Sequence, residues 1–157
     1  MSIVLTRIDD RLIHGQVMTA WVRHTKANRI IIVDDGVAKD PFLQKVMKMA
    51  APSDIKVDVY TIEEGTEALL KKFDDKENVI ILVKNPKTVA SLIEGGAPIQ
   101  KIVVGGMAAS AGRKKFYKNI SASEEEKEIF KTLLEKEVDI HIQIVPDNKP
   151  IAIKNLL

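Results

Sequence analysis

The segment RIDDRLIHGQV, residues 7–17, places one histidine among charged residues whose types suit phosphate chemistry. His14 supplies an imidazole, which titrates near neutrality and has an unprotonated nitrogen available at pH 7. Arg11 lies three residues earlier and carries a planar guanidinium that can hold phosphate oxygens in pairs. A nucleophilic nitrogen beside such a cationic group predicts phosphoryl transfer through a phosphohistidine.

The neighbouring residues add to this prediction. Gly15 and Gln16 open an expected helix, whose first turn offers free N–H groups and the positive end of a dipole to an anion. Asp10 is expected to orient the imidazole or the guanidinium without touching phosphate, because two anions repel each other. Asp9 and Asp10 are about equally compatible with loop solvation or helix capping.

Plainer interpretations of the same residue types stay open. A lone histidine in a loop is often only a structural hydrogen-bonding residue, and Arg11 could be a surface salt-bridge partner. His24 falls on the apolar stripe of the expected helix and His141 alternates with isoleucines, so only His14 has suitable neighbours. Residues 34–35, two aspartates after a strand, favour helix capping over a metal site, and no metal is predicted.

A second loop with glycines, GGMAASAG at 105–112, follows the strand KIVVGG at 101–106. Gly105 and Gly106 allow a close backbone approach and could complete the anion pocket. The loop is not a P-loop, because Arg113 follows where a lysine and a threonine would stand, and it is not a dinucleotide fingerprint. By itself it is a weak signal.

These loops need a scaffold, and the chain alternates short β-rich runs with helical patterns. The expected strands are 2–8, 28–34, 55–60, 78–83, 101–106 and 139–145. This alternation predicts βαβ units, and hence an α/β fold with an open, mostly parallel sheet and helices on both faces. Residues 55–60 and 139–145 alternate apolar and polar types, so we place these two strands at the sheet edges.

Length and composition narrow the class of protein. The 157 residues fit a single domain, 1–157. A formal net charge of +2 and an aromatic content of 4% argue against a nucleic-acid partner. The lack of cysteine excludes disulfides, thiolate zinc sites and cysteine nucleophiles. No signal peptide or membrane-length apolar run is found, so a cytoplasmic location is expected; no cofactor is predicted.

Together, RIDDRLIHGQV and VVGGM strongly resemble the IIB component of the mannose-family (mannose–fructose–sorbose class) sugar phosphotransferase system. The resemblance covers essentially the whole chain; the first motif is highly specific and GGM is supporting. It implies a transferase in which His14 accepts the phosphoryl group at Nδ1, with Arg11 and Asp10 shaping its loop. The facing loop would contain Gly105, Gly106 and Met107.

The resemblance also implies a fold and partners. The family's sheet has seven strands in the order 3-2-4-1-5-6-7 with an antiparallel strand at one edge, so the first and fifth strands would be neighbours. The strand missing from the six above is expected at 116–120. A IIA phosphocarrier on a separate chain would donate the phosphoryl group, and the sugar would enter through IIC and IID membrane components, with which this chain would associate peripherally.

Recognition of these partners is expected to use local positive charge. The candidates are Arg7, Arg11 and Arg23 near the first loop, and Arg113, Lys114 and Lys115 beyond the second. Residues 113–115 are alternatively an ordinary solvated charge run. Residues 108–110 depart from the aromatic or long polar residue that some family members carry there, so partner or substrate preference could differ.

Two other functions fit the sequence less well. A phosphohistidine mutase or phosphatase has an Arg-His-Gly signature and a second catalytic histidine, whereas Ile13 precedes His14 here. A receiver-like signalling domain, which is not an enzyme, needs a phosphoacceptor aspartate after its third strand, where this chain has Tyr60 and Thr61.

Overall fold

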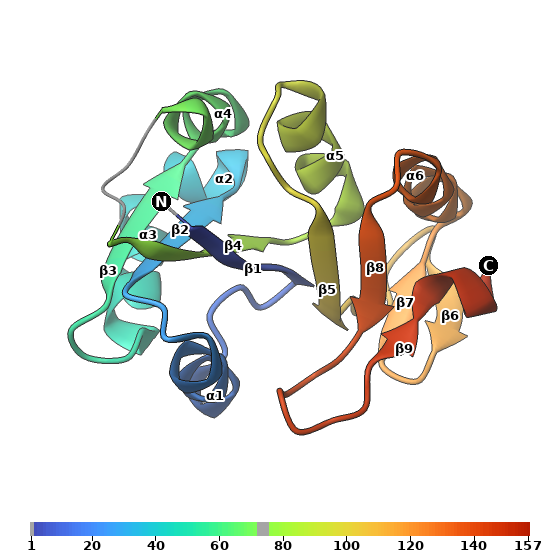
Figure 1. The fold of residues 1–157 in the computed structure, drawn as a ribbon, viewed down its shortest axis with the longest axis horizontal. Helices are drawn as coiled ribbons and strands as arrows, with labels where there is room; N and C mark the ends of the chain where they lie inside the picture. The colour runs from blue at the N-terminus through green and yellow to red at the C-terminus, as the bar shows by residue number, and fades with distance from the viewer. Residues whose placement is uncertain (1, 72–75) are drawn as a thin grey trace.

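The computed structural model describes residues 2–71 and 76–157, which are built around a seven-stranded sheet (Figure 1). The strands lie in the order β3-β2-β4-β1-β5-β8-β9. Their bounds are β1 Ser2–Asp9, β2 Arg29–Val33, β3 Lys56–Tyr60, β4 Asn78–Val83, β5 Lys101–Gly106, β8 Asp139–Ile142 and β9 Ile151–Ala152. The β8–β9 pair is antiparallel, and the other described pairs of this sheet are parallel.

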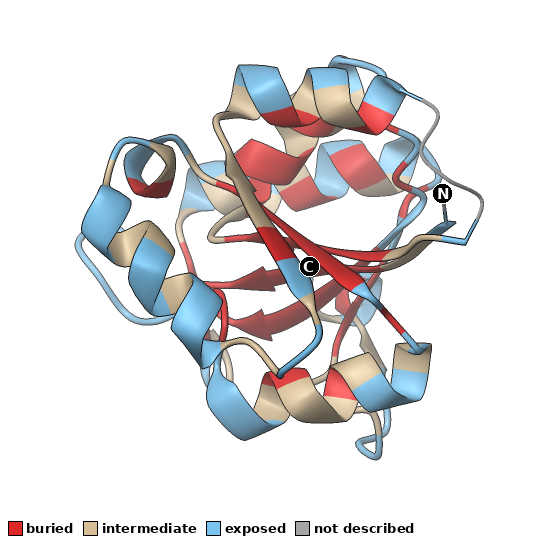
Figure 2. Cartoon of the chain, turned by 90° about the vertical axis from the view of Figure 1, so that its left-hand side faces the viewer, coloured by how far each residue is buried: buried red, intermediate tan, exposed pale blue. Residues whose placement is uncertain are grey.

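Helices cover both faces of this sheet. They are α1 Gly15–Thr25, α2 Asp35–Ala38, α3 Pro41–Ala50, α4 Ile62–Leu70, α5 Pro86–Glu94, α6 Glu124–Glu135 and the 3-10 helix η1 Ile153–Leu156. One apolar core joins the sheet to α1, α2 and α3, with Met18 and Trp21 of α1 inside it. The other joins it to α4, α5 and α6, with Leu92 and Phe130 inside it. Figure 2 shows the buried strands between the two helical layers.

The sequence pattern explains the central strands and the helix starts. Residues 30–33 of β2 and 80–83 of β4 are all 0% exposed, as continuously apolar strands covered on both faces should be. Thr61 and Ser123 each form a capping box with the glutamate three residues later, and these boxes start α4 and α6. The predicted α/β fold class is therefore confirmed in its main features.

One edge of the sheet differs from the prediction. β3 is an edge strand as expected, but β8, within the predicted strand 139–145, lies inside the sheet between β5 and β9. The seventh strand is β9, whose two residues are too few for a readable period. The stretch at 116–120 belongs instead to a separate antiparallel ribbon of β6 (Lys114–Tyr117) and β7 (Ile120–Ala122). The alternation in 139–145 has another cause, because His141 and Gln143 line a cavity.

β1 and β5 are neighbours, and they pair only near their carboxyl ends. Their register begins with Arg7 opposite Val103 and ends with Asp9 opposite Gly106. The loops that follow the two strands therefore leave the sheet side by side. In open α/β sheets this carboxyl edge is where ligands usually bind.

Candidate active site

His14 stands at the junction between the loop after β1 and the first turn of α1. It is the N-cap residue of that helix, with φ −115° and ψ 94°, and its carbonyl oxygen accepts a hydrogen bond from Met18 N at 2.9 Å. Its imidazole makes no capping hydrogen bond, and the residue is exposed. The ring is thus accessible to another protein, close to the first-turn N–H groups that have no partner within the helix.

Two apolar side chains anchor this loop in the core. Leu12 and Ile13 are buried in the same core that packs against α1. Leu12 has a φ of 56°, a left-handed conformation that costs about 1–2 kcal/mol for a residue with a Cβ atom. Burying a leucine side chain contributes about 1.5–3 kcal/mol and offsets that cost. The core therefore holds a loop shape that leaves Arg11 and His14 exposed.

Asp9 organises the charged groups of the loop. Its carboxylate is 1% exposed and accepts hydrogen bonds from Arg7 Nη1 at 2.6 Å and from Arg11 N, Nε and Nη2 at 2.9, 3.1 and 3.1 Å. Burial by itself raises the pKa of Asp9, but the hydrogen bonds from Arg11 and the charge of Arg7 hold that pKa below its ordinary value. The ionised carboxylate fixes the half-exposed guanidinium of Arg11 in the loop that carries His14.

Arg7 lies beneath this ion pair and is 0% exposed. Besides its bond to Asp9, its Nη2 donates a hydrogen bond to the carbonyl oxygen of Ile144 at 3.1 Å. Burial lowers the pKa of Arg7, and the charge of Asp9 offsets part of that effect. The prediction that Arg7 contacts a partner protein is therefore wrong. Residues two apart in a strand share one face, so β1 carries Arg7 and Asp9 inward together.

The loop after β5 fits against these charges through its glycines. A Cβ atom at Gly105 would overlap the guanidinium of Arg7. A Cβ atom at Gly106 would lie 3.2 Å from Asp9 Oδ1 and 3.4 Å from Arg11 Nη2. The absence of a side chain at both positions therefore gives the two arginines and the aspartate their room.

Asp10 joins the two loops. Its N–H donates to the carbonyl oxygen of Gly106 at 3.2 Å, and its Oδ2 accepts from Ala108 N at 2.6 Å and from Arg113 Nη1 at 3.2 Å. Arg113 also holds Glu126 of α6 through two hydrogen bonds of 2.9 and 2.8 Å. The side-chain hydrogen bonds of Asp10 thus go to Ala108 and Arg113, and it is Asp9, not Asp10 as predicted, that holds Arg11.

The remaining predicted residues of the second loop divide between interior and surface. Met107 is 0% exposed, and its carbonyl oxygen accepts a hydrogen bond from β7 at 2.8 Å, so it supports the loop from within. Lys114 and Lys115 on β6 are exposed, as is Arg23 on α1. Arg113, at 14% side-chain exposure, is an internal clamp instead of a free rim charge. Over residues 2–71 and 76–157, no three histidine, aspartate or glutamate residues gather as metal ligands would.

Comparison with known proteins identifies the family. Residues 3–157 match the family described as "PTS system sorbose subfamily IIB component". The chain belongs to this IIB family. The fructose-specific EIIB component of Bacillus subtilis is 35% identical over 148 residues, which cover 94% of this chain and 91% of that one. The mannose-specific EIIAB component of Escherichia coli is 34% identical over 157 residues, all of this chain but 49% of the longer relative.

Solved structures of IIB proteins share the fold throughout. The IIB domain of the sorbose permease from Klebsiella pneumoniae superposes with a TM-score of 0.94 at 34% identity, over 99% of this chain and 95% of that one. The manxB structure from Thermoanaerobacter tengcongensis gives a TM-score of 0.90 at 38% identity, over 98% and 93%. The family prediction is confirmed: this IIB chain is a phosphocarrier component of a mannose-family sugar phosphotransferase system, and neither alternative function is favoured.

The role of Asp9 goes beyond the loop solvation or helix capping expected from its residue type. The motif contained a signal for its position. Arg7, Asp9 and Arg11 are every second residue and alternate between positive and negative charge, at the end of β1 and just beyond it. Alternate residues share a face, so an ion pair between the first two follows from the strand period. The pattern does not show how deeply the Arg7–Asp9 ion pair is buried, because that burial depends on the glycines of β5.

Proposed function

We propose that His14 of this IIB chain accepts a phosphoryl group from a phosphorylated IIA protein and passes it to a sugar that enters through IIC and IID membrane components. The observation that carries the proposal is the exposed imidazole at the start of α1, in one loop with an arginine that a buried carboxylate holds in place. The sugar is a separate question, because relatives at 32–35% identity are named for fructose, sorbose, mannose and N-acetylgalactosamine.

The charge of the loop supports this chemistry. Within the trio of Arg7, Asp9 and Arg11, two guanidinium groups against one carboxylate leave one net positive charge, and the carboxylate of Asp10 in the same loop is paired with Arg113. Burial of Arg7 and Asp9 confines their charges to each other, so the free side of Arg11 meets the phosphoryl oxygens. The N–H groups and dipole of the first turn of α1 add to its attraction for an anion. The cluster therefore suits a phosphoryl group on His14.

The proposed transfer exchanges one phosphorus–nitrogen bond for another. The lone pair of His14 Nδ1 attacks phosphorus, the bond to the donor imidazole breaks, and its electron pair stays with the donor nitrogen. Arg11 and the first-turn N–H groups hold the three equatorial oxygens in line between the two rings. In the second step a sugar hydroxyl oxygen attacks the phosphorus, and the bond to His14 Nδ1 breaks with its electron pair left on that nitrogen. The hydroxyl proton passes to solvent, and the neutral imidazole of His14 is regenerated.

The positions of the other histidines support the single-histidine mechanism over a mutase or phosphatase. His24 lies ten residues further along α1, which is about 15 Å at 1.5 Å per residue. His141 lies on β8, and both residues line a cavity elsewhere in the molecule. A second histidine that could shuttle protons at His14 is not found in the described part of the chain.

The proposed location is the cytoplasmic face of the membrane transporter. None of the helices in the described ranges is long and apolar enough to span a membrane. We propose that the IIB chain meets the IIC and IID components through its surface.

Reconstitution tests this proposal. When the chain is added to membranes that contain IIC and IID without IIB, together with phospho-IIA, it is expected to restore sugar phosphorylation. Failure of a folded chain to do so with sugars of every relative's class would contradict the proposal.

Asp10→Asn is expected to slow phosphoryl uptake several-fold without abolishing it. The asparagine oxygen can still accept the hydrogen bond from Ala108 N, but the attraction to Arg113 is lost and the two loops loosen. Because Asp10 is 29% exposed, the free energy of unfolding should fall by only about 1 kcal/mol. Timed phosphoryl-uptake assays measure the change in rate, and urea unfolding measures the change in stability. Complete loss of uptake by a stable variant would place Asp10 in the chemistry and overturn this account.

A variant with both Lys114→Ala and Lys115→Ala is expected to take up phosphate about three- to ten-fold more slowly at low salt, through a lower association rate. Both side chains are exposed beyond the second loop, where they can steer an acidic partner. The matched control replaces Lys45 and Lys48, an exposed pair on α3, by alanine. Screening should shrink the defect as ionic strength rises. Equal rates for the two double variants at low salt would contradict the steering role.

A further inference from the structure

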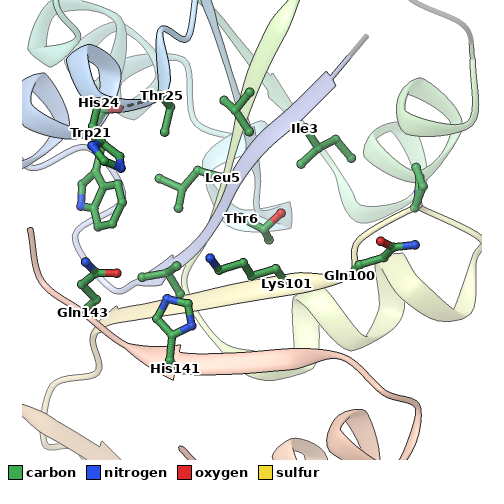
Figure 3. A pocket seen from close by; sticks show the side chains of 13 residues that line it. Ile3, Leu5, Thr6, Trp21, His24, Thr25, Gln100, Lys101, His141 and Gln143 are labelled. Atoms are coloured by element: carbon green, nitrogen blue, oxygen red, sulfur yellow. Dashed lines mark hydrogen bonds between the residues drawn. The ribbon is translucent and has the colours of Figure 1, made fainter. Parts of the chain in front are cut away.

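The sheet opens into a cavity where β1 and β5 diverge. The two strands pair from Arg7 and Val103 onward, and before that point their amino-terminal parts are separated. The space has a volume of about 540 Å³ and lies between α1, β1, β5 and β8 (Figure 3). Cavities of this size hold small molecules such as a monosaccharide derivative.

The wall of this cavity combines one cation with several neutral hydrogen-bonding groups. Figure 3 shows the Lys101 side chain extending along the cavity, between β1 and the imidazole of His141. Gln100 adds a carboxamide, which donates and accepts hydrogen bonds. Gln143 adds its Oε1 acceptor, because its Nε2 already donates to the carbonyl oxygens of Pro146 and Asn148 at 3.0 and 2.9 Å. Burial and the charge of Lys101 lower the pKa of His141, so its ring is neutral at pH 7 and offers one donor and one acceptor.

Acidic groups are absent from the described residues that line the cavity. Asp139 stands directly opposite Lys101 in the pairing of β5 with β8, but it is 66% exposed and lies 3.9 Å from His141 Nδ1, and it forms no ion pair with Lys101 among the described residues. The ammonium of Lys101 therefore has no carboxylate partner within the cavity wall. A ligand with one negative charge and several hydroxyl groups would match both the cation and the carboxamides.

An unpaired hydroxyl in the wall gives independent support. Thr6 is 2% exposed, and its Oγ1 has no hydrogen-bond partner among the described residues. A buried hydroxyl without a partner costs about 1–3 kcal/mol. The cost falls at a residue that lines the cavity, where a ligand hydroxyl would relieve it.

We propose that this cavity is a binding site for a small hydroxylated anion, a sugar phosphate or a sugar acid. The anionic group binds Lys101, and the hydroxyl groups bind Gln100, Gln143 and Thr6. The site is distinct from His14, but Trp21 in its wall is linked to the charged groups that hold the His14 loop. Trp21 Nε1 and Arg7 Nη2 both donate to the carbonyl oxygen of Ile144, at 2.9 and 3.1 Å.

The chain contains one tryptophan, and Trp21 lines the cavity, so its fluorescence reports on occupancy. The protein is titrated with glucose 6-phosphate, gluconate, glucose and inorganic phosphate, while backbone amide NMR shifts of residues around the cavity are followed in parallel. At least one of the two hydroxylated anions is expected to saturate the site at millimolar concentration or below, and to bind at least about tenfold more tightly than glucose or phosphate alone. The anion that binds distinguishes a phosphate site from a carboxylate site.

Lys101→Gln is expected to weaken this binding about tenfold or more, because it removes the cation and keeps a polar side chain. The matched control is Lys114→Gln, on β6 outside the cavity, which should bind as the parent does. Lys101 is the exposed first residue of β5, so the variant is expected to fold, and its amide spectrum checks this. Absence of cavity shifts with both anions, equal binding of glucose, or unchanged affinity in Lys101→Gln would each overturn the proposal.

Discussion

His14→Gln should reduce phosphoryl uptake from phospho-IIA by at least about a thousandfold, to the background of the assay. Glutamine keeps a polar side chain at the N-cap but has no nucleophilic nitrogen, so no phosphorus–nitrogen bond can form. The residue is exposed and makes no capping hydrogen bond, so the free energy of unfolding should change by less than about 0.5 kcal/mol.

The matched control for this variant is His24→Gln, the same change at an exposed position on the same helix. It should take up phosphate at the parent's rate, because His24 lies near the other end of α1. The measurement is labelled phosphoryl uptake by both variants at equal concentration. Uptake by His14→Gln within tenfold of the parent, or an equal loss in His24→Gln, would contradict the role proposed for His14.

Asp9→Asn should lower the free energy of unfolding by about 3–5 kcal/mol at pH 7. Asp9 and Arg7 are 1% and 0% exposed, so the neutral side chain leaves the guanidinium buried without its counter-charge. The asparagine oxygen can still accept from Arg11 N and Nε, but the amide nitrogen that replaces Oδ2 cannot accept from Arg11 Nη2. Arg11 is therefore held less firmly, which should slow phosphoryl uptake beyond the effect of stability. Urea unfolding measures the first effect, and uptake assayed where the variant is folded measures the second.

Two controls separate the ion pair from simple loss of packing. Asp9→Asn combined with Arg7→Met removes both charges, and should be less destabilised than Asp9→Asn alone. Because the pKa of Asp9 is lowered on folding, its contribution to stability is present above the ordinary aspartate value and lost as pH falls through the lowered one. The stability difference between parent and Asp9→Asn should therefore shrink in acid. A destabilisation below about 1 kcal/mol at pH 7 would show that the pair does not hold the loop.

The fold was largely predictable because its strongest signals are local. Continuous apolar runs are a local signal for central strands such as β2 and β4, and Thr61 and Ser123, each with a glutamate three residues later, are local signals for helix starts. β9 was not predictable, since two residues carry no period and its position depends on pairing with β8. Residues 139–145 were wrongly placed at an edge of the sheet. Alternation of apolar and polar residues indicates that one face of the strand is not covered by a helix, and such a face occurs beside a cavity as well as at a sheet edge.

In the site, too, local features could be predicted from the sequence and features that depend on distant residues could not. His14 and Arg11 could be recognised from type and spacing, and both are exposed in one loop. Arg7 was misjudged because a charged residue usually lies at the surface, and only the facing glycine makes room for its burial. The internal clamp at Arg113 was equally hidden, because its partners Asp10 and Glu126 are distant in sequence and meet only in the folded chain.

The most direct test of the central claim is to locate the phosphoryl group on the chain. The parent protein is incubated with phospho-IIA, and the product is examined by phosphorus NMR, by stability in acid and alkali, and by tandem mass spectrometry at neutral pH or above. The account predicts one phosphoryl group per chain, on His14 Nδ1, that is lost in acid and retained in alkali. A phosphoryl group on His24 or His141, or an alkali-labile acyl phosphate on an aspartate, would contradict it.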